Sequence, residues 1–271
     1  MRTLTHSAIV VACLLAPFPA RAGQSEHRLD VGGRTLFLNC VGESSGPTVV
    51  LMAGGGGTSA VWSAVQKDTA AFTRVCSYDR AGLGQSDKIA QPQTAAEIVE
   101  DLHRLLVAAE IRPPYVLVGH SIGGIYIRLY TSQYPRDVVG LVFVDSSHEE
   151  QLNRFAAIST RMLDLEPGPK WRDASAMRKE GFLAPGEALT WRTEVPIVAL
   201  EHGAPSKPPS GSGIPDADFA RLETAWHEMQ EDLASRSLHG QLRRAENSGH
   251  YIQMQQPGLV VTAIRDVMPA R

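Results

Sequence analysis

Short strand-like runs alternate with amphipathic stretches along most of this chain, and this alternation constrains the fold more than any other feature. Helical periodicity occurs between or after the later runs, most clearly at residues 94–110 and 256–268. Strands that alternate with helices predict a mostly parallel sheet with helices on both faces. The expected strands are 27–31, 35–41, 48–53, 74–79, 115–119, 140–145, 196–201 and 241–246. The first two are joined by GGR, which predicts a hairpin at one edge of an eight-stranded sheet.

The first 22 residues, MRTLTHSAIVVACLLAPFPARA, have the pattern of a secretory signal peptide. A basic residue precedes an apolar run, and an A-x-A arrangement predicts cleavage after Ala22. The apolar run is shorter than the roughly 20 residues that span a bilayer, so we expect no stable membrane insertion. A lipobox that ends at Cys13 is an alternative, although the apolar run continues past it. The pattern predicts export to the periplasm or secretion, and leaves residues 23–271 as the mature domain.

Two long segments interrupt the alternation of strands and helices. Residues 147–194 are too long for an ordinary connection and have helical character broken by Pro and Gly, which predicts a helical cap. Residues 203–218 are rich in Pro, Gly and Ser and are expected to form a mobile loop. The net charge of −3 and the scattered basic residues argue against nucleic acid as a partner.

The motif GHSIG places Ser121 between two glycines, after a strand pattern and before a helical one. This strand, turn and helix context is the one that a G-x-S-x-G nucleophile requires. A sharp turn there would strain the serine backbone, and side chains at positions 119 and 123 would collide with neighbouring elements. The alternative is that Ser121 only caps the following helix, because serine is a favoured N-cap residue.

Four consecutive glycines, Gly54 to Gly57, follow the expected strand at 48–53. Glycine lets a backbone N–H turn toward an oxyanion, and acyl transfer needs two such donors. Gly55 is the expected first donor, and the N–H of Ile122, directly after the serine, is the expected second. A phosphate-binding loop is disfavoured because no G-K-[ST] ending follows.

His250, in the segment NSGHYIQMQQP, is the expected base among the nine histidines. A serine hydroxyl becomes a good nucleophile when a neighbouring imidazole takes its proton. His250 follows the last expected strand. Enzymes with a G-x-S-x-G nucleophile carry their serine, acid and histidine in that order along the chain, and the position of His250 fits this order. His120 lies within the turn itself, where it is expected to pack or to form a hydrogen bond.

The motifs VVLMAGGGG, YDRAGLGQSD, GHSIGG and NSGHYIQMQQP occur in this order, and together they resemble the α/β-hydrolase superfamily. The resemblance extends from about residue 34 to residue 268 and implies an α/β-hydrolase fold. It does not include the cap. The fold and nucleophile are specified by these motifs far more closely than the substrate is.

The resemblance leaves the position of the acid open. Members of the superfamily commonly carry it after the strand that corresponds to PIVALE, but this chain has no aspartate there. Other members carry the acid at the end of the preceding strand, which makes Asp145 the expected acid. Its alternative role is to cap the following helix through nearby amides. Glu201 is the second candidate, and Asp216 or Asp218 could approach from the mobile loop.

The resemblance also implies a disulfide, because the second and fourth strands of this superfamily are neighbours. Cys40 and Cys76 lie in those strands. Their disulfide would close a loop of about 37 residues and stabilise the fold by roughly 3 to 4 kcal/mol.

The function that these features favour is hydrolysis of a small carboxylic ester through an acyl-enzyme, with Ser121, His250 and Asp145 as the triad. No cofactor is expected, and no Cys or His spacing suggests a metal site. Amide or peptide hydrolysis of the iminopeptidase type and perhydrolysis would use the same triad. A non-catalytic binding protein on the same fold is the remaining alternative.

Overall fold

The computed structural model describes residues 25–43, 46–162, 193–204, 207–208 and 210–270. The predicted signal peptide and most of the predicted cap lie outside these residues. Of the predicted cap range, the described part contains helix α4 (Gln151–Ile158) and the short helix η2 (Thr160–Met162).

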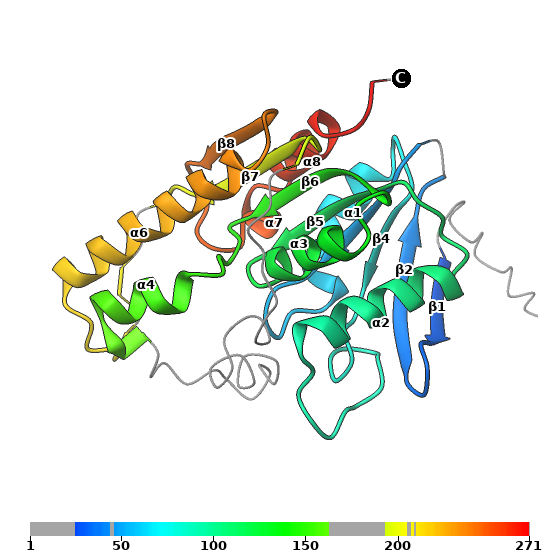
Figure 1. The fold of residues 1–271 in the computed structure, drawn as a ribbon, viewed down its shortest axis with the longest axis horizontal. Coiled ribbons are helices and arrows are strands. Elements are labelled where there is room, and N and C mark those ends of the chain that lie inside the picture. The colour runs from blue at the N-terminus through cyan, green and yellow to red at the C-terminus, as the bar shows by residue number, and fades with distance from the viewer. Residues whose placement is uncertain (1–24, 44–45, 163–192, 205–206, 209, 271) are drawn as a thin grey trace, which may run out of the picture.

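An eight-stranded sheet runs through the molecule in the order β1-β2-β4-β3-β5-β6-β7-β8 (Figure 1). Strands β1 and β2 form an antiparallel hairpin at one edge, β2 is antiparallel to β4, and all other neighbours are parallel. The predicted mostly parallel sheet with an edge hairpin is confirmed. The strands are β1 Ser25–Asp30, β2 Thr35–Val41, β3 Thr48–Met52, β4 Val75–Tyr78, β5 Tyr115–His120, β6 Val138–Val144, β7 Ile197–His202 and β8 Gly240–Ala245.

Helices cover both faces of the sheet. One face packs against α2 and α3 through residues such as Leu117 and Leu102, and the other packs against α1 and α8 through Val118 and Ile264. Neighbouring residues of β5 thus point to opposite faces, as the pleat of a strand requires. The other helices are η1 Ser59–Trp62, α1 Ser63–Thr69, α2 Ala95–Ala108, α3 Gly123–Gln133, α6 Asp216–Ser235, α7 Ile252–Gln255 and α8 Pro257–Asp266.

The predicted disulfide is present between β2 and β4. Cys40 and Cys76 are register partners in this antiparallel pair, and their sulfur atoms are 2.09 Å apart. The disulfide therefore fastens the edge hairpin to the parallel part of the sheet.

The loop predicted at residues 203–218 ends earlier than expected, because helix α6 begins at Asp216. Asp216 and Asp218 lie in the first turn of α6, a helix of 20 residues that, together with α4, lies on the side of the molecule where β7 and β8 end the sheet (Figure 1). Carboxylates stabilise the positive end of a helix dipole, which accounts for their position. The prediction that either aspartate approaches the site from a mobile loop is therefore wrong.

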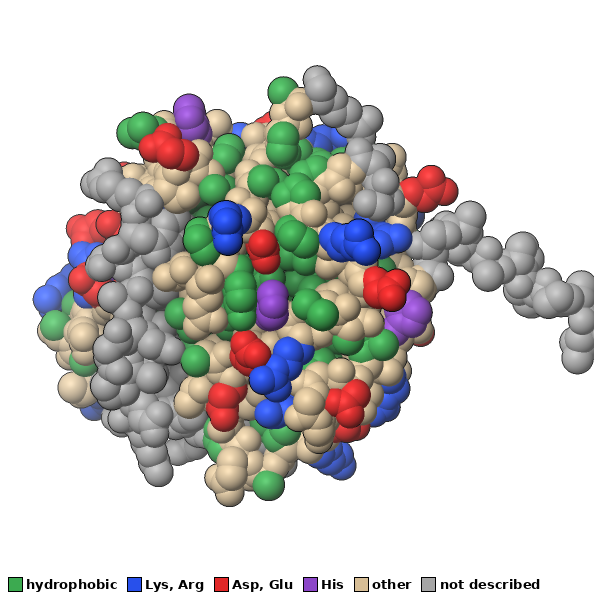
Figure 2. Space-filling model, turned by 45° about the vertical axis from the view of Figure 1, so that its right-hand side comes forward, with side chains coloured by type: hydrophobic (Ala, Val, Ile, Leu, Met, Phe, Trp, Pro, Cys, Tyr) green, Lys and Arg blue, Asp and Glu red, His purple; other side chains and the backbone are tan. Residues whose placement is uncertain are grey.

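The surface shows no single-sign charge field on the face drawn in Figure 2, where acidic and basic side chains are interspersed. Within the described ranges, no helix combines the length and apolar character needed to cross a bilayer.

Candidate active site

Ser121 lies at the sharp turn between β5 and α3, at the carboxyl edge of the sheet. Its φ of 52° is in the left-handed region, which a serine rarely adopts. The turn is held by a hydrogen bond of 3.1 Å from the Ser121 N–H to the carbonyl of Val144 in β6. A Cβ atom at Gly119 would lie 2.6 Å from the carbonyl oxygen of Gly123. The predicted need for glycine beside the serine is therefore confirmed at this position.

Asp145 directly follows β6, and its carboxylate contacts the predicted base. Its Oδ2 atom is 2.7 Å from Nδ1 of His250, which lies in the loop between β8 and α7. Asp145 is only 1% exposed and also has a positive φ, of 43°. The N–H of Ser147 donates to the carbonyl of Ser121, so it does not make Asp145 a helix cap. Asp145 is thus the acid that the structure brings to His250.

Glu201, the second candidate acid, faces a different histidine. Its Oε2 atom is 2.6 Å from Nδ1 of His227 on α6, and its Oε1 atom is 3.8 Å from Arg244. No contact between Glu201 and His250 occurs in the described part of the chain. Glu201 therefore lies outside the group that contains Asp145.

Three further donors surround the Asp145 carboxylate. Oδ1 accepts from the backbone N–H of His202 at 3.1 Å and from Nε1 of Trp226 at 2.9 Å, and the His202 ring nitrogen Nδ1 lies 3.0 Å from it. Burial alone would raise the pKa of Asp145, but the hydrogen bonds from His202 and His250 outweigh it and hold the pKa well below its ordinary value. Asp145 is therefore ionised at neutral pH.

The loop that carries His250 is tied to the serine turn through His120. Nε2 of His120 donates to the backbone carbonyl of His250 at 2.8 Å, and the two rings are 4.6 Å apart. Burial, followed by the nearby His250, lowers the pKa of His120 to about 3, so this ring stays neutral. Among the described residues, neither the Ser121 hydroxyl nor Nε2 of His250 has a hydrogen-bond partner.

Both predicted oxyanion donors have free N–H groups, and Arg80 holds the glycine loop that carries one of them, Gly55. Neither Gly55 nor Ile122 donates its N–H to another atom of the described chain. Arg80 donates to the carbonyls of Ala53 and Gly54 at 2.5 and 2.7 Å. Because the C=O and N–H of a trans peptide point in opposite directions, the bond to the Gly54 carbonyl turns the Gly55 N–H away from Arg80.

The segment YDRAGLGQSD holds the glycine loop in place. Sequence analysis assigned this segment no role of its own. Asp79 accepts from the backbone N–H of Ser59 at 2.7 Å and from that of Gln85 at 2.8 Å. A Cβ atom at Gly84 would overlap the Asp79 carboxylate, which explains that glycine. The neighbouring Arg80 is 3% exposed, so the motif buries its polar groups against the backbone of the glycine loop.

Helix α6 presents one polar face to the acid, and sequence reasoning missed it. Glu223, Trp226 and Gln230 are spaced i, i+3 and i+7, so they share a face. Glu223 contacts His202, Trp226 contacts Asp145, and Gln230 donates to the carbonyl of Ser146 at 2.8 Å. The spacing was visible in the sequence, but the partners were not.

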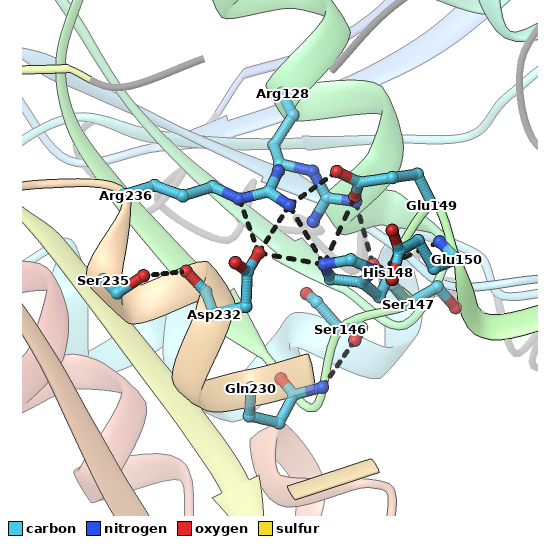
Figure 3. Close-up of polar contacts among 10 residues, drawn as sticks. All are labelled: Arg128, Ser146, Ser147, His148, Glu149, Glu150, Gln230, Asp232, Ser235 and Arg236. Carbon is cyan, nitrogen blue, oxygen red and sulfur yellow. Dashed lines mark hydrogen bonds and ion pairs between the residues drawn. The ribbon is translucent and has the colours of Figure 1, made fainter. Parts of the chain in front are cut away.

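A second polar cluster anchors the segment after Asp145 (Figure 3). Arg128, on α3 and fully buried, donates to the carbonyl of Ser147 at 3.0 Å and to Glu149 at 3.2 Å. Arg236, at the end of α6, donates to Glu149 at 2.5 Å and to Asp232 at 2.6 Å. Two arginines thus hold two carboxylates and connect α3, the acid-bearing segment and α6.

His148 lies within this cluster, with its ring 3.0 Å from Asp232 through Nε2. Its Nδ1 atom accepts the backbone N–H of Glu150 at 3.1 Å, which leaves at most one ring proton, on Nε2, and Nη2 of Arg236 lies 2.9 Å from that same nitrogen. Burial lowers the pKa of His148, and Arg128 and Arg236 lower it further despite Asp232. His148 is therefore neutral.

The clustered histidines and carboxylates do not form a metal site. Over the described ranges, no group of three or more His, Cys, Asp or Glu side chains could hold a metal ion. What this edge of the sheet offers is a strained serine, a buried ionised carboxylate joined to an imidazole, and two free N–H groups.

Comparison with known proteins defines the class. The model of the alpha/beta hydrolase family matches residues 49–263, and the chain belongs to this family. It is 33% identical over 236 residues to the putative carbamate hydrolase RutD of Shigella flexneri, which covers 86% of this chain and 79% of the relative. It also matches a probable transporter from Hormonema carpetanum, of whose length it spans 18%.

Two solved structures share the fold. A probable hydrolytic enzyme from Pseudomonas aeruginosa PAO1 has a TM-score of 0.67 at 20% identity, with 94% of this chain and 97% of that chain covered. A putative lipase from Acinetobacter baumannii AYE has a TM-score of 0.64 at 20% identity, with 89% of each chain covered.

Proposed function

We propose that this protein is a serine hydrolase that cleaves small carboxylic esters through an acyl-enzyme. The observation that supports this most directly is the 2.7 Å contact between Asp145 and His250 at the sheet edge where Ser121 adopts a strained φ. An aspartate on Nδ1 holds an imidazole in the tautomer whose Nε2 can take a proton.

In the proposed reaction, Nε2 of His250 removes the hydroxyl proton as Ser121 attacks the ester carbonyl. The N–H groups of Gly55 and Ile122 stabilise the oxyanion, and His250 then protonates the leaving alcohol. Water repeats the two steps on the acyl-enzyme and releases the acid. The hydrogen bond between Ser121 and His250 forms when substrate binds, because such contacts are often long in the free enzyme.

We favour an ester because the residue at the turn is a serine. Reactions in which a carboxylate of the enzyme attacks the substrate would need an acidic residue at that turn. The fold shared with a putative lipase is in keeping with this choice. The relative named as a putative carbamate hydrolase favours a second candidate, cleavage of a carbamate by the same groups. Both reactions pass through an oxyanion that two N–H donors would stabilise.

The proposed site of action is outside the cytoplasm. Two sequence features support it: the signal-like pattern of residues 1–22 and the Cys40–Cys76 disulfide, since disulfides persist in oxidising compartments. Mass spectrometry of the N-terminus of the exported protein tests this, with cleavage after Ala22 as the expected result.

A fluorophosphonate probe and a substrate panel test the proposed chemistry. We expect covalent labelling at Ser121 and turnover of p-nitrophenyl esters of graded chain length, both lost in Ser121→Ala. Ser63→Ala, which alters an exposed serine at the start of α1, is the matched control and should behave as wild type. A p-nitrophenyl carbamate, a p-nitroanilide and a peracid assay separate the alternatives. Absence of labelling would favour a binding protein.

A further inference from the structure

His202, the last residue of β7, has a carboxylate at each of its two ring nitrogens. Nδ1 is 3.0 and 3.1 Å from the two oxygens of Asp145, and Nε2 is 2.9 Å from Oε2 of Glu223. The side chain is 15% exposed, so water does not compete strongly for these contacts. Sequence analysis assigned no role to this histidine.

The two contacts determine the protonation state of the ring. An ionised carboxylate only accepts hydrogen bonds, so each ring nitrogen of His202 must donate, which makes the ring an imidazolium. The hydrogen bonds with Asp145 and with Glu223 raise the pKa of His202 to about 10, against the opposing effect of burial. His202 is therefore positively charged throughout the neutral range.

We propose that His202 is a positioning residue of the hydrolase centre, a lasting cation that holds Asp145 with Oδ2 toward His250 and offsets part of its negative charge. This inference rests on the proposed function. Asp145 has a donor on each side: His250 on Oδ2, and the backbone N–H of His202 together with Trp226 on Oδ1. The ring of His202 spans both oxygens, so the carboxylate cannot turn without losing it.

The charge of His202 acts on His250 through their shared carboxylate. Other groups face His250 as well: neutral His120 from the end of β5, and the rings of Tyr251 and Trp226 from the start of α7 and from α6. Glu223 on α6 contacts Nε2 of His202. A fixed cation opposes the build-up of further positive charge around Asp145, so we expect the reaction to continue to lower pH with His202 than without it.

The variant His202→Gln removes this cation while keeping a polar side chain. We expect the acid limb of the pH profile of kcat to move up by about one pH unit. We also expect kcat to fall about 10- to 100-fold while KM changes by less than about threefold, since the lost contact positions Asp145 and does not bind the substrate.

His227→Gln is the matched control, because His227 also joins α6 to a carboxylate of β7, Glu201, but does not touch Asp145. Its acid limb should coincide with that of wild type. An unmoved acid limb in His202→Gln, or an equal shift in His227→Gln, would overturn the inference. If His202→Gln does not fold, the protonation state of His202 in the wild-type protein, measured by NMR, still tests the inference.

A measurement without substrate separates this inference from the proposed function. Histidine labelled with 15N reports by NMR whether both nitrogens of His202 have protons, and we expect both from pH 5 to 8.5. Loss of one proton below pH 8 overturns the inference even in an active enzyme. If His202 has both protons but the enzyme shows no turnover and no labelling of Ser121, the proposed function is refuted and the positive charge of His202 still stands.

Discussion

Two histidines near the acid each contact an aspartate, yet one is positively charged and the other is neutral. His202 and His148 each lie 3.0 Å from an aspartate oxygen, that of Asp145 and that of Asp232. Yet the pKa of His202 is raised to about 10 and the pKa of His148 is lowered. A carboxylate in contact therefore does not by itself determine the charge of an imidazole.

The other nitrogen and the competing cations explain the difference. The second nitrogen of His202 faces Glu223, whereas that of His148 accepts a backbone N–H. Asp232 is also shared with Arg236, while no arginine contacts Asp145 in the described residues. The region around Asp145 thus pairs carboxylates with histidines that can gain or lose protons, and the cluster of Figure 3 pairs them with arginines that stay charged.

Replacing the two aspartates should give the largest contrast. Asp145→Asn keeps the shape but offers Oδ1 and an amide, so His250 loses its orienting anion and kcat should fall about 10³- to 10⁴-fold. Asp232→Asn, the matched change in the second cluster, should keep kcat within about threefold of wild type. Steady-state kinetics on the best p-nitrophenyl ester check this. Similar losses in both variants would show that the clusters do not differ in role.

Removing a buried arginine should lower stability more than activity. In Arg128→Met, Glu149 and the Ser147 carbonyl lose a buried donor, and unfolding in urea should show a loss of about 3 kcal/mol. Arg154→Met breaks a pair with Glu228 that is partly exposed, so it should cost less than about 1 kcal/mol. Equal costs would mean that Arg128 does not anchor the segment.

The stability that His202 contributes should decrease at alkaline pH. Its folded-state pKa of about 10 is above the ordinary value of 6.5, so its contribution is complete below about pH 6.5 and is lost as pH rises through 10. We expect the free energy of unfolding of wild type to decrease steadily over this range. The free energy of unfolding of His202→Gln, measured in urea from pH 6 to 10, should be flatter. Parallel curves would contradict the assigned charge.

His148 should show the smallest effect, and with the opposite sign. Its pKa is lowered in the folded protein, so the unfolded chain binds the proton more tightly and stability falls as pH drops below about 6.5. The free energy of unfolding of His148→Gln between pH 7 and 5 should therefore depend less on pH than that of wild type. A steeper dependence in the variant would show that His148 is charged in the fold.

The local features of this fold were predictable because they depend on neighbours in sequence. Strand β2 occupies the predicted residues 35–41, and the elbow glycines are required by contacts within a few residues of Ser121. The acid was harder, because the common position after β7 has no aspartate. Asp145 was selected because other members of the superfamily carry the acid at the end of the preceding strand, and the register confirms that β6 lies beside β5.

The remaining features depend on contacts between distant segments, which a single sequence does not reveal. Trp226 and Asp145 are 81 positions apart in the sequence, and His202 and Asp145 are 57 positions apart. The first residues of helix α6 were assigned to a loop because they lie within IPDAD, which follows a segment rich in Pro and Ser. The roles of Arg80 and Arg128 depend on carbonyls that any residue type could provide.

Trp226 has an optical consequence. Its indole N–H binds the Asp145 carboxylate, and its ring meets that of His250 edge-on with 6.3 Å between centroids. An imidazolium quenches indole emission more strongly than a neutral imidazole does, so the charged His202 ring, 6.4 Å away, sets a constant background of quenching to which a change at His250 adds. The chain thus has a built-in fluorophore beside the proton that moves during turnover, and the difference in emission between wild type and Trp226→Phe provides a label-free record of that proton in stopped-flow experiments.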